Sequence, residues 1–212
     1  MTRIKICGLR TPQDVAAAVA CGADDIGLVF FERSPRNLTL DEAAELALTV
    51  PLGIRKVGLV VDAGDATLDD LVARVPLDML QLHGSETPER CAEIRDRTGL
   101  QVMKAIGIGS ADDLNRIALY TAVCEQVLID AKAPKETDLP GGNGRTFDWS
   151  LLQGVSISVP WLLAGGLRPS NVADAIRATN APGVDVSSGV ERRAGEKDPD
   201  AIRDFCEAVR TV

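Results

Sequence analysis

The residue types best suited to acid–base chemistry stand at the ends of short apolar runs. The segment RIKIC, residues 3–7, ends on Cys7, and QVLID, residues 126–130, ends on Asp130. Side chains alternate along a strand, so Lys5 and Cys7 share one face. If that face is interior, the Lys5 ammonium favours the Cys7 thiolate, a base, and Asp130 serves as an acid if burial raises its pKa. The pair predicts proton-transfer chemistry.

Two glycine-rich segments near the C-terminus are suited to binding an anion. The residues of interest in LLAGGLRPSN and VDVSSGVE are Gly165, Gly166, Asp185, Ser187, Ser188 and Gly189. Either segment alone is equally consistent with an ordinary turn. α/β barrels, however, often build a phosphate site after their seventh and eighth strands, from glycine-rich loops and helix N-termini. The two segments together therefore predict a small phosphate ester as the substrate.

Three further polar residues follow apolar runs and are candidates for substrate binding. Arg36, in FERSPRNLT, is suited to holding a carboxylate with two parallel hydrogen bonds, although a solvated loop charge is the alternative. In QLHG, Gln81 is expected to orient a substrate hydroxyl. We expect His83 to be a neutral, hydrogen-bonded side chain rather than the acid–base group.

Eight β-type runs alternate with helical patterns along the whole chain. They begin near Arg3, Asp25, Arg55, Asp78, Gln101, Gln126, Trp161 and Gly183, a spacing of about 26 residues typical of βα units. Eight such units favour a closed barrel. The first βα turn lacks the G-x-G-x-x-G pattern that would favour an open doubly wound sheet. The prediction is one α/β domain, a single (β/α)8 TIM barrel over residues 1–212.

The barrel brings the candidate residues together, because its active site lies at the carboxyl ends of the strands. The strand ends form a ring of Cys7, Phe30, Asp62, Gln81, His83, Lys104, Asp130, Gly165, Gly166, Asp185, Ser187 and Ser188. Such a concentration of polar groups is not required by an apolar core.

Local signals predict where several helices begin and end. Thr11, Thr39 and Ser170 suit helix starts, Gly22 and Gly99 suit helix ends, and Thr146 or Asp148 is expected to cap a helix on which Phe147 and Trp149 pack. The segment Ala131–Arg145 contains KAPKETDLPGGNG. A loop of this length in a compact domain is usually functional or disordered, and we expect it to be mobile.

Composition excludes several classes of protein. The net charge of −8 argues against nucleic acid or an anionic membrane as the main partner. No apolar run reaches 18 residues and no signal peptide precedes RIKIC, so a cytoplasmic protein is expected. One histidine and five scattered cysteines make a zinc site improbable. No metal or other cofactor is expected, and the acidic surface favours a monomer.

The motifs occur in the order found in one known family. KICGL, SPR, QLHG, LID, GGNGRTFDWSLL, LAGGL and DVSSGVE resemble phosphoribosylanthranilate isomerase, roughly from Ile4 to Asp198. The resemblance implies an Amadori rearrangement of N-(5-phosphoribosyl)anthranilate, the third step from chorismate in tryptophan biosynthesis. It implies that Asp130 is the general acid that protonates the ring oxygen. It also implies that Cys7 is the general base at C2 and that Arg36 binds the anthranilate carboxylate.

Three positions depart from the family pattern, namely Asn37, Asn143 and Ala194, and they affect substrate preference more than reaction type. The related histidine-pathway isomerase is the nearest alternative, but it would place an aspartate where this chain has Cys7. A metal-dependent sugar-phosphate epimerase would need more histidines than the single one present. A non-catalytic phosphate-binding barrel is the alternative from another class, and the presence of both Cys7 and Asp130 argues against it.

Overall fold

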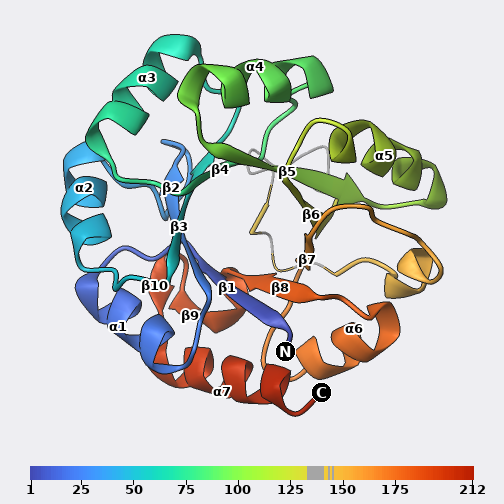
Figure 1. The fold of residues 1–212 in the computed structure, drawn as a ribbon. Coiled ribbons are helices and arrows are strands. Elements are labelled where there is room, and N and C mark those ends of the chain that lie inside the picture. Colours follow the sequence, from blue (N-terminus) through green and yellow to red (C-terminus); the bar gives the residue numbers. More distant parts are fainter. Residues whose placement is uncertain (133–140, 143, 145) are drawn as a thin grey trace.

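A computed structural model shows eight parallel strands closed into a barrel in chain order, with β8 hydrogen-bonded to β1. The structure describes residues 1–132, 141–142, 144 and 146–212. Figure 1 looks down the barrel, with the helices forming an outer ring around the strands. The predicted (β/α)8 fold is confirmed. Most of the loop expected to be mobile, together with Asn143, lies outside the described residues.

The strands agree closely with the sequence prediction. They are β1 (Arg3–Cys7), β2 (Asp25–Phe30), β3 (Arg55–Val60), β4 (Met79–Leu82), β5 (Gln101–Ile108), β6 (Gln126–Ala131), β7 (Trp161–Leu163) and β8 (Gly183–Val186). Only β4 begins one residue later than expected. These strands are buried on both sides, and such strands are recognisable as near-continuous apolar runs.

Seven α-helices and three 3-10 turns follow the strands among the described residues. They are α1 (Pro12–Ala20), α2 (Leu40–Leu48), α3 (Asp65–Arg74), α4 (Pro88–Thr98), η1 (Ala111–Leu114), α5 (Asn115–Thr121), η2 (Trp149–Leu152), α6 (Val172–Thr179), η3 (Ser188–Val190) and α7 (Pro199–Arg210). Thr11 and Thr39 close the expected capping boxes on α1 and α2. Gly99 ends α4 in the left-handed conformation.

Two helix predictions are wrong in detail. The helix expected after Thr146 or Asp148 is only the single turn η2, which Asp148 caps through the backbone N–H of Ser150. The helix expected to start at Ser170 begins after Asn171. The single turn is followed by Gly154, whose φ of +76° is not helical.

Apolar side chains fill both the barrel and the layer outside it. A small cluster inside the strands contains Val57, Met79, Met103, Ala105, Leu128, Leu162 and Ala164. A much larger cluster packs the outer face of the strands against the helices. At the amino ends of the strands, the fully buried Asp25 binds Arg3 and Arg55, each through two hydrogen bonds of 2.7–3.2 Å. This ion cluster joins β1, β2 and β3 at the end away from the candidate site.

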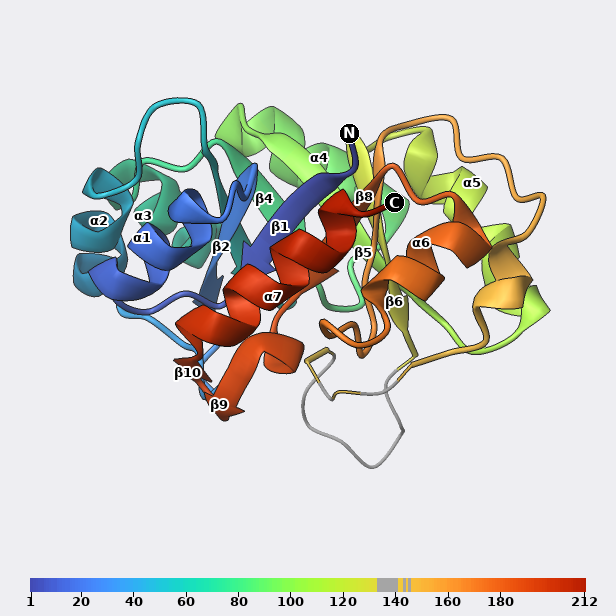
Figure 2. The same ribbon diagram turned by 90° about the horizontal axis from the view of Figure 1, so that it is seen from below.

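The chain adds a small hairpin at the carboxyl ends of the strands. After β8 and η3, β9 (Glu191–Arg193) and β10 (Glu196–Lys197) pair antiparallel before α7 begins. Figure 2 shows this hairpin at the end of the molecule opposite the N-terminus. Among the residues that the structure describes, no helix is long and apolar enough to cross a bilayer.

Candidate active site

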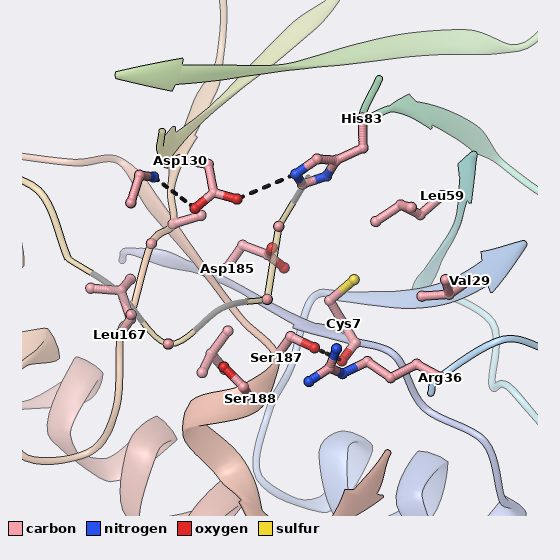
Figure 3. A pocket seen from close by; sticks show the side chains of 18 of the residues that line it. Cys7, Val29, Arg36, Leu59, His83, Asp130, Leu167, Asp185, Ser187 and Ser188 are labelled. Carbon is pink, nitrogen blue, oxygen red and sulfur yellow. Dashed lines mark hydrogen bonds and ion pairs between the residues drawn. The ribbon is translucent and has the colours of Figure 1, made fainter. Parts of the chain in front are cut away.

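One open cavity at the carboxyl ends of the strands collects the predicted site residues. It encloses about 850 Å³ including its mouth. Its lining includes every candidate: Cys7, Arg36, Gln81, His83, Asp130, Gly165, Gly166, Asp185, Ser187, Ser188 and Gly189. Figure 3 shows Cys7 and Asp130 on different sides of this one space. The barrel therefore gathers residues from six different strands and their loops.

Three members of the predicted ring do not line the cavity. Phe30, Asp62 and Lys104 are absent from its lining, whereas the neighbouring Phe31 takes part. The Lys104 ammonium is instead buried under the turn after β4, where it donates to Leu82 O, Gly84 O and Glu86 Oε2 at 2.8–3.1 Å. Strand ends point some side chains inward and some outward, so position at an end is not enough to place a group in the site.

Cys7 lies beside a buried ion pair. Lys5, on the same face of β1, donates to Asp185 Oδ1 at 2.8 Å. Burial raises the pKa of the Cys7 thiol most strongly; Lys5 and Lys197 oppose this effect, and Asp185 adds to it. The net pKa of the thiol is raised, although Lys5 itself lowers it and favours the thiolate as the sequence predicted. Burial lowers the pKa of Lys5, but Asp185 and Cys7 outweigh it and keep the ammonium charged.

Gly8 makes room for the arginine of the site. Its φ of +77° is in the region that favours glycine, and a Cβ at this position would lie 2.5 Å from Arg36 Cδ. The Cys-Gly pair therefore ends β1 in a turn over which the Arg36 side chain can pass.

Asp130, His83 and Gln81 lie next to one another in a row. Gln81 Nε2 is a donor only, and it lies 2.9 Å from His83 Nδ1, so Nδ1 accepts and the ring proton belongs on Nε2. His83 Nε2 faces Asp130 Oδ2 at 3.3 Å, and Asp130 Oδ1 accepts from the backbone N–H of Ala131 at 2.7 Å (Figure 3). This arrangement fits the neutral histidine expected from the sequence. It also fixes the rotamer of the Asp130 carboxyl.

Arg36 is held by a partner that the sequence analysis did not name. Its Nε and Nη2 donate to Glu191 Oε1 and Oε2 at 2.7 and 2.8 Å, and its side chain is only 7% exposed. Arg36 is therefore not a solvated loop charge. Its Nη1 remains on the cavity side, close to Gly142, where a Cβ would lie 2.9 Å from that nitrogen.

The two glycine-rich turns meet at one edge of the cavity. Gly189 packs so closely on the turn after β7 that a Cβ would lie 1.8 Å from Leu167 O. The described hydrogen bonds leave the backbone N–H groups of Gly165 and Gly166 without a protein acceptor. Ser187 Oγ donates to Cys7 O at 3.1 Å, which ties this edge to the end of β1. The edge thus offers backbone donors and hydroxyls to an anion.

Lys197 and Glu191 contact residues that line the cavity, and sequence reasoning missed both. The Lys197 side chain is fully buried; its Nζ donates to Glu191 Oε1 at 2.7 Å and to Ser187 O at 3.0 Å. Burial lowers the pKa of Lys197, although Glu191 acts in the opposite direction. The tight turn in ERRAGEK predicts a hairpin, and that signal could have directed attention to both residues.

Comparisons with known proteins find one family over nearly the whole chain. A family model described as N-(5′-phosphoribosyl)anthranilate isomerase matches residues 4–208. A protein of this name from Paracoccus denitrificans (strain Pd 1222) is 59% identical over 202 residues, covering 95% of this chain and 94% of its own. Another of the same name from Cereibacter sphaeroides (strain ATCC 17023) is 56% identical over 98% of both chains.

Solved structures give the same result in three dimensions. The crystal structure of phosphoribosyl anthranilate isomerase from Thermotoga maritima superposes with a TM-score of 0.90 at 35% identity, covering both chains completely. A crystal structure of phosphoribosyl anthranilate isomerase in complex with reduced 1-(o-carboxyphenylamino)-1-deoxyribulose 5-phosphate has a TM-score of 0.87 at 33% identity, again over both whole chains.

Proposed function

The chain belongs to the N-(5′-phosphoribosyl)anthranilate isomerase family, and we propose that Cys7 and Asp130 are the general base and general acid of its reaction. The enzyme converts N-(5′-phosphoribosyl)anthranilate to 1-(2-carboxyphenylamino)-1-deoxyribulose 5-phosphate, an aldose-to-ketose rearrangement in tryptophan biosynthesis. The reaction opens a furanose ring and moves a proton from carbon, so it needs one acid and one base near the same sugar.

Asp130 acts first in the proposed mechanism. Its carboxyl gives a proton to the furanose ring oxygen while the bond between that oxygen and C1 breaks. The lone pair of the anthranilate nitrogen forms the C1=N bond of a protonated Schiff base. The hydrogen bond from Ala131 N to Oδ1 leaves Oδ2 as the oxygen that carries the proton, and His83 holds the carboxyl toward the cavity.

Cys7 acts second. Its thiolate removes the proton from C2, the electrons of that C–H bond form the C1=C2 double bond, and the C1=N π electrons return to nitrogen. The resulting enolamine tautomerises to the ketone. The thiol of the resting protein has a raised pKa, chiefly because it is buried. The thiolate is therefore the minor form of Cys7 at neutral pH, and its fraction depends on the charges of Lys5, Asp185 and Lys197 around it.

Two anchors orient the sugar between these groups. The Arg36 guanidinium binds the anthranilate carboxylate, and the edge formed by Gly165, Gly166, Ser187, Ser188 and Gly189 binds the phosphate. Gln81 Oε1, for which no described group is a partner, is the acceptor available for a substrate hydroxyl. Asp185 lines the same cavity, although its carboxylate is already bound to Lys5.

The observation that carries the assignment of Cys7 and Asp130 is that both line one cavity, with the phosphate edge and Arg36 beside them. The test follows fluorescence as purified protein consumes freshly made phosphoribosylanthranilate. Cys7→Ala and Asp130→Asn should each remove turnover. Wild-type turnover in either variant would remove that residue from its role, whereas lack of turnover by the wild-type chain would contradict the function itself.

The partner is a small phosphosugar, and we propose that one chain suffices for catalysis and acts in the cytoplasm. The support for a monomer is the acidic net charge of −8. One related structure is of a dimeric enzyme converted to monomers, so sedimentation at assay concentration is the decisive measurement. A dimer that loses activity on dissociation would contradict the monomer proposal.

A further inference from the structure

The β9–β10 hairpin places one carboxylate between two cations at the edge of the cavity. Glu191 accepts two hydrogen bonds from Arg36 and one from Lys197, at 2.7–2.8 Å, and its side chain is 3% exposed. Burial alone would raise the pKa of Glu191, but Arg36 and Lys197 together lower it. The group is therefore an anion at neutral pH, and it holds Arg36, the member of the three that lines the cavity.

We propose that Glu191 is a positioning residue for substrate recognition: it holds the Arg36 guanidinium with its free edge toward the aryl carboxylate. This inference rests on the proposed role of Arg36 and adds the residue that makes that role possible. Glu191 itself makes no contact with the substrate in this proposal. It acts through Arg36 alone.

The Arg36 guanidinium has two edges that can each bind a carboxylate. Arginine has five N–H donors in a rigid plane. Glu191 occupies the edge formed by Nε and one Nη2 hydrogen. The edge formed by Nη1 and the other Nη2 hydrogen is left, and among the described residues none accepts from Nη1. That edge can hold a second carboxylate with two parallel bonds.

Fixing the Arg36 side chain before the substrate binds increases the affinity for the aryl carboxylate. A free arginine loses rotamer entropy when it binds, and a side chain already locked by a neighbour avoids that loss. The Glu191 contact also prevents Arg36 from turning toward Asp185 or Asp130, which line the same cavity. Two bonds to one carboxylate fix the plane of the guanidinium as well as its position.

The hairpin itself is seated against the Arg36 loop. Gly195, with φ of +80°, lies so close to Pro35 that a Cβ would be 2.4 Å from its carbonyl oxygen. The backbone N–H of Gly195 also donates to Glu191 Oε2 at 3.3 Å. Lys197 then links Glu191 to Ser187, whose hydroxyl bonds Cys7 O. The carboxylate anchor, the phosphate edge and the base are thus parts of one hydrogen-bonded unit.

The experiment measures discrimination for the carboxylate. Dissociation constants are measured for reduced 1-(o-carboxyphenylamino)-1-deoxyribulose 5-phosphate and for its phenylamino counterpart, which lacks the carboxylate. The discrimination is the dissociation constant of the ligand without the carboxylate divided by that of the carboxylated ligand. In E191Q we expect this ratio to fall about tenfold, mainly through weaker binding of the carboxylated ligand, because the amide nitrogen that replaces one carboxylate oxygen only donates and cannot accept from Arg36. General loss of structure would weaken both ligands alike and leave the ratio unchanged.

The controls separate this inference from the function on which it rests. E196Q, in the same hairpin but paired with the exposed Arg193, should retain the wild-type ratio. R36M should abolish discrimination, and E191Q should then have no further effect in the R36M background. Wild-type discrimination in R36M would overturn the role of Arg36. If R36M lost the discrimination while E191Q kept the wild-type ratio, only the role of Glu191 would be overturned.

A second variant keeps the test decisive if E191Q does not fold. E191D keeps the charge between Arg36 and Lys197 but shortens the side chain by one methylene, so it cannot make all three contacts. We expect its ratio to fall at least about threefold, with a melting temperature closer to wild type. A folded E191D with the wild-type ratio would overturn the proposal.

Discussion

Lys5 and Asp185, paired across β1 and β8, form a 2.8 Å ion pair in the wall of the cavity next to Cys7. The strand register places the two residues opposite each other, and both are less than a tenth exposed. The two groups have opposite effects on the Cys7 thiol, since the Lys5 ammonium lowers its pKa and the Asp185 carboxylate raises it. The strength of the proposed base is therefore set by a balance of neighbours rather than by one lysine.

This balance predicts a pH dependence. The base form of Cys7 is the thiolate, and the pKa of the thiol is raised, so kcat/KM should rise with pH from neutrality and fall as pH decreases. In Asp185→Asn one group that raises this pKa is lost, and the rise should move to lower pH by on the order of one unit. The rate of Cys7 alkylation by iodoacetamide as a function of pH measures the same shift without turnover. An unmoved alkylation profile would show that Asp185 does not control the thiol.

Cys7→Ala should lower kcat by about two to four orders of magnitude, the usual contribution of a general base. The dissociation constant of the reduced product analogue should stay within about threefold, because the anchors at Arg36 and the phosphate edge are unchanged. Cys21→Ala, which removes a thiol outside the cavity, is the matched control and should keep normal turnover. If Cys7→Ala lost binding and turnover together, a structural role would explain the result better.

Asp130→Asn should be as inactive as Cys7→Ala but should fail at an earlier step. The amide still accepts from Ala131 N and fits beside His83, yet it carries no proton to give to the ring oxygen. Solvent exchange of the C2 proton should therefore be absent in this variant, since no Schiff base forms. Exchange at the wild-type rate would place Asp130 after ring opening and contradict its role as first acid.

Arg36→Met should raise KM about tenfold to a hundredfold with a much smaller change in kcat, because a charge-assisted hydrogen-bonded pair contributes about 1.5–3 kcal/mol. Glu191 stays compensated by Lys197 in this variant, so the fold should be retained. Arg10→Met removes an exposed arginine near Pro35 and serves as the comparison. An unchanged KM in Arg36→Met would show that another group holds the carboxylate.

Glu86→Gln should cost about 3–5 kcal/mol of unfolding free energy, because it leaves the buried Lys104 ammonium without its counter-charge. Asp174→Asn, which breaks an exposed pair with Arg177, should cost no more than about 1 kcal/mol. Urea unfolding of the two variants provides the comparison. Equal losses would indicate that the Lys104 ammonium is stabilised by Leu82 O and Gly84 O alone.

The barrel, and the placement of the proposed acid and base at its strand ends, were accessible from local sequence patterns. Strands buried on both faces appear as apolar runs, and helix caps such as Thr11 and Thr39 act within three residues, so neither depends on distant contacts. Because every parallel strand presents its carboxyl end at the same side, the order of the strands is enough to place Cys7 and Asp130 in one site.

Contacts between distant residues required the tertiary structure. Arg36 meets Glu191 across 155 positions of sequence, and Lys5 meets Asp185 across 180. No local pattern records such a pairing. The net pKa of Cys7 has the same origin, since burial and three charged neighbours from different parts of the chain contribute to it. Sequence alone determined which groups are present at each strand end, whereas the folded structure decided their partners, since electrostatic interactions depend on distance in space and on exclusion of water.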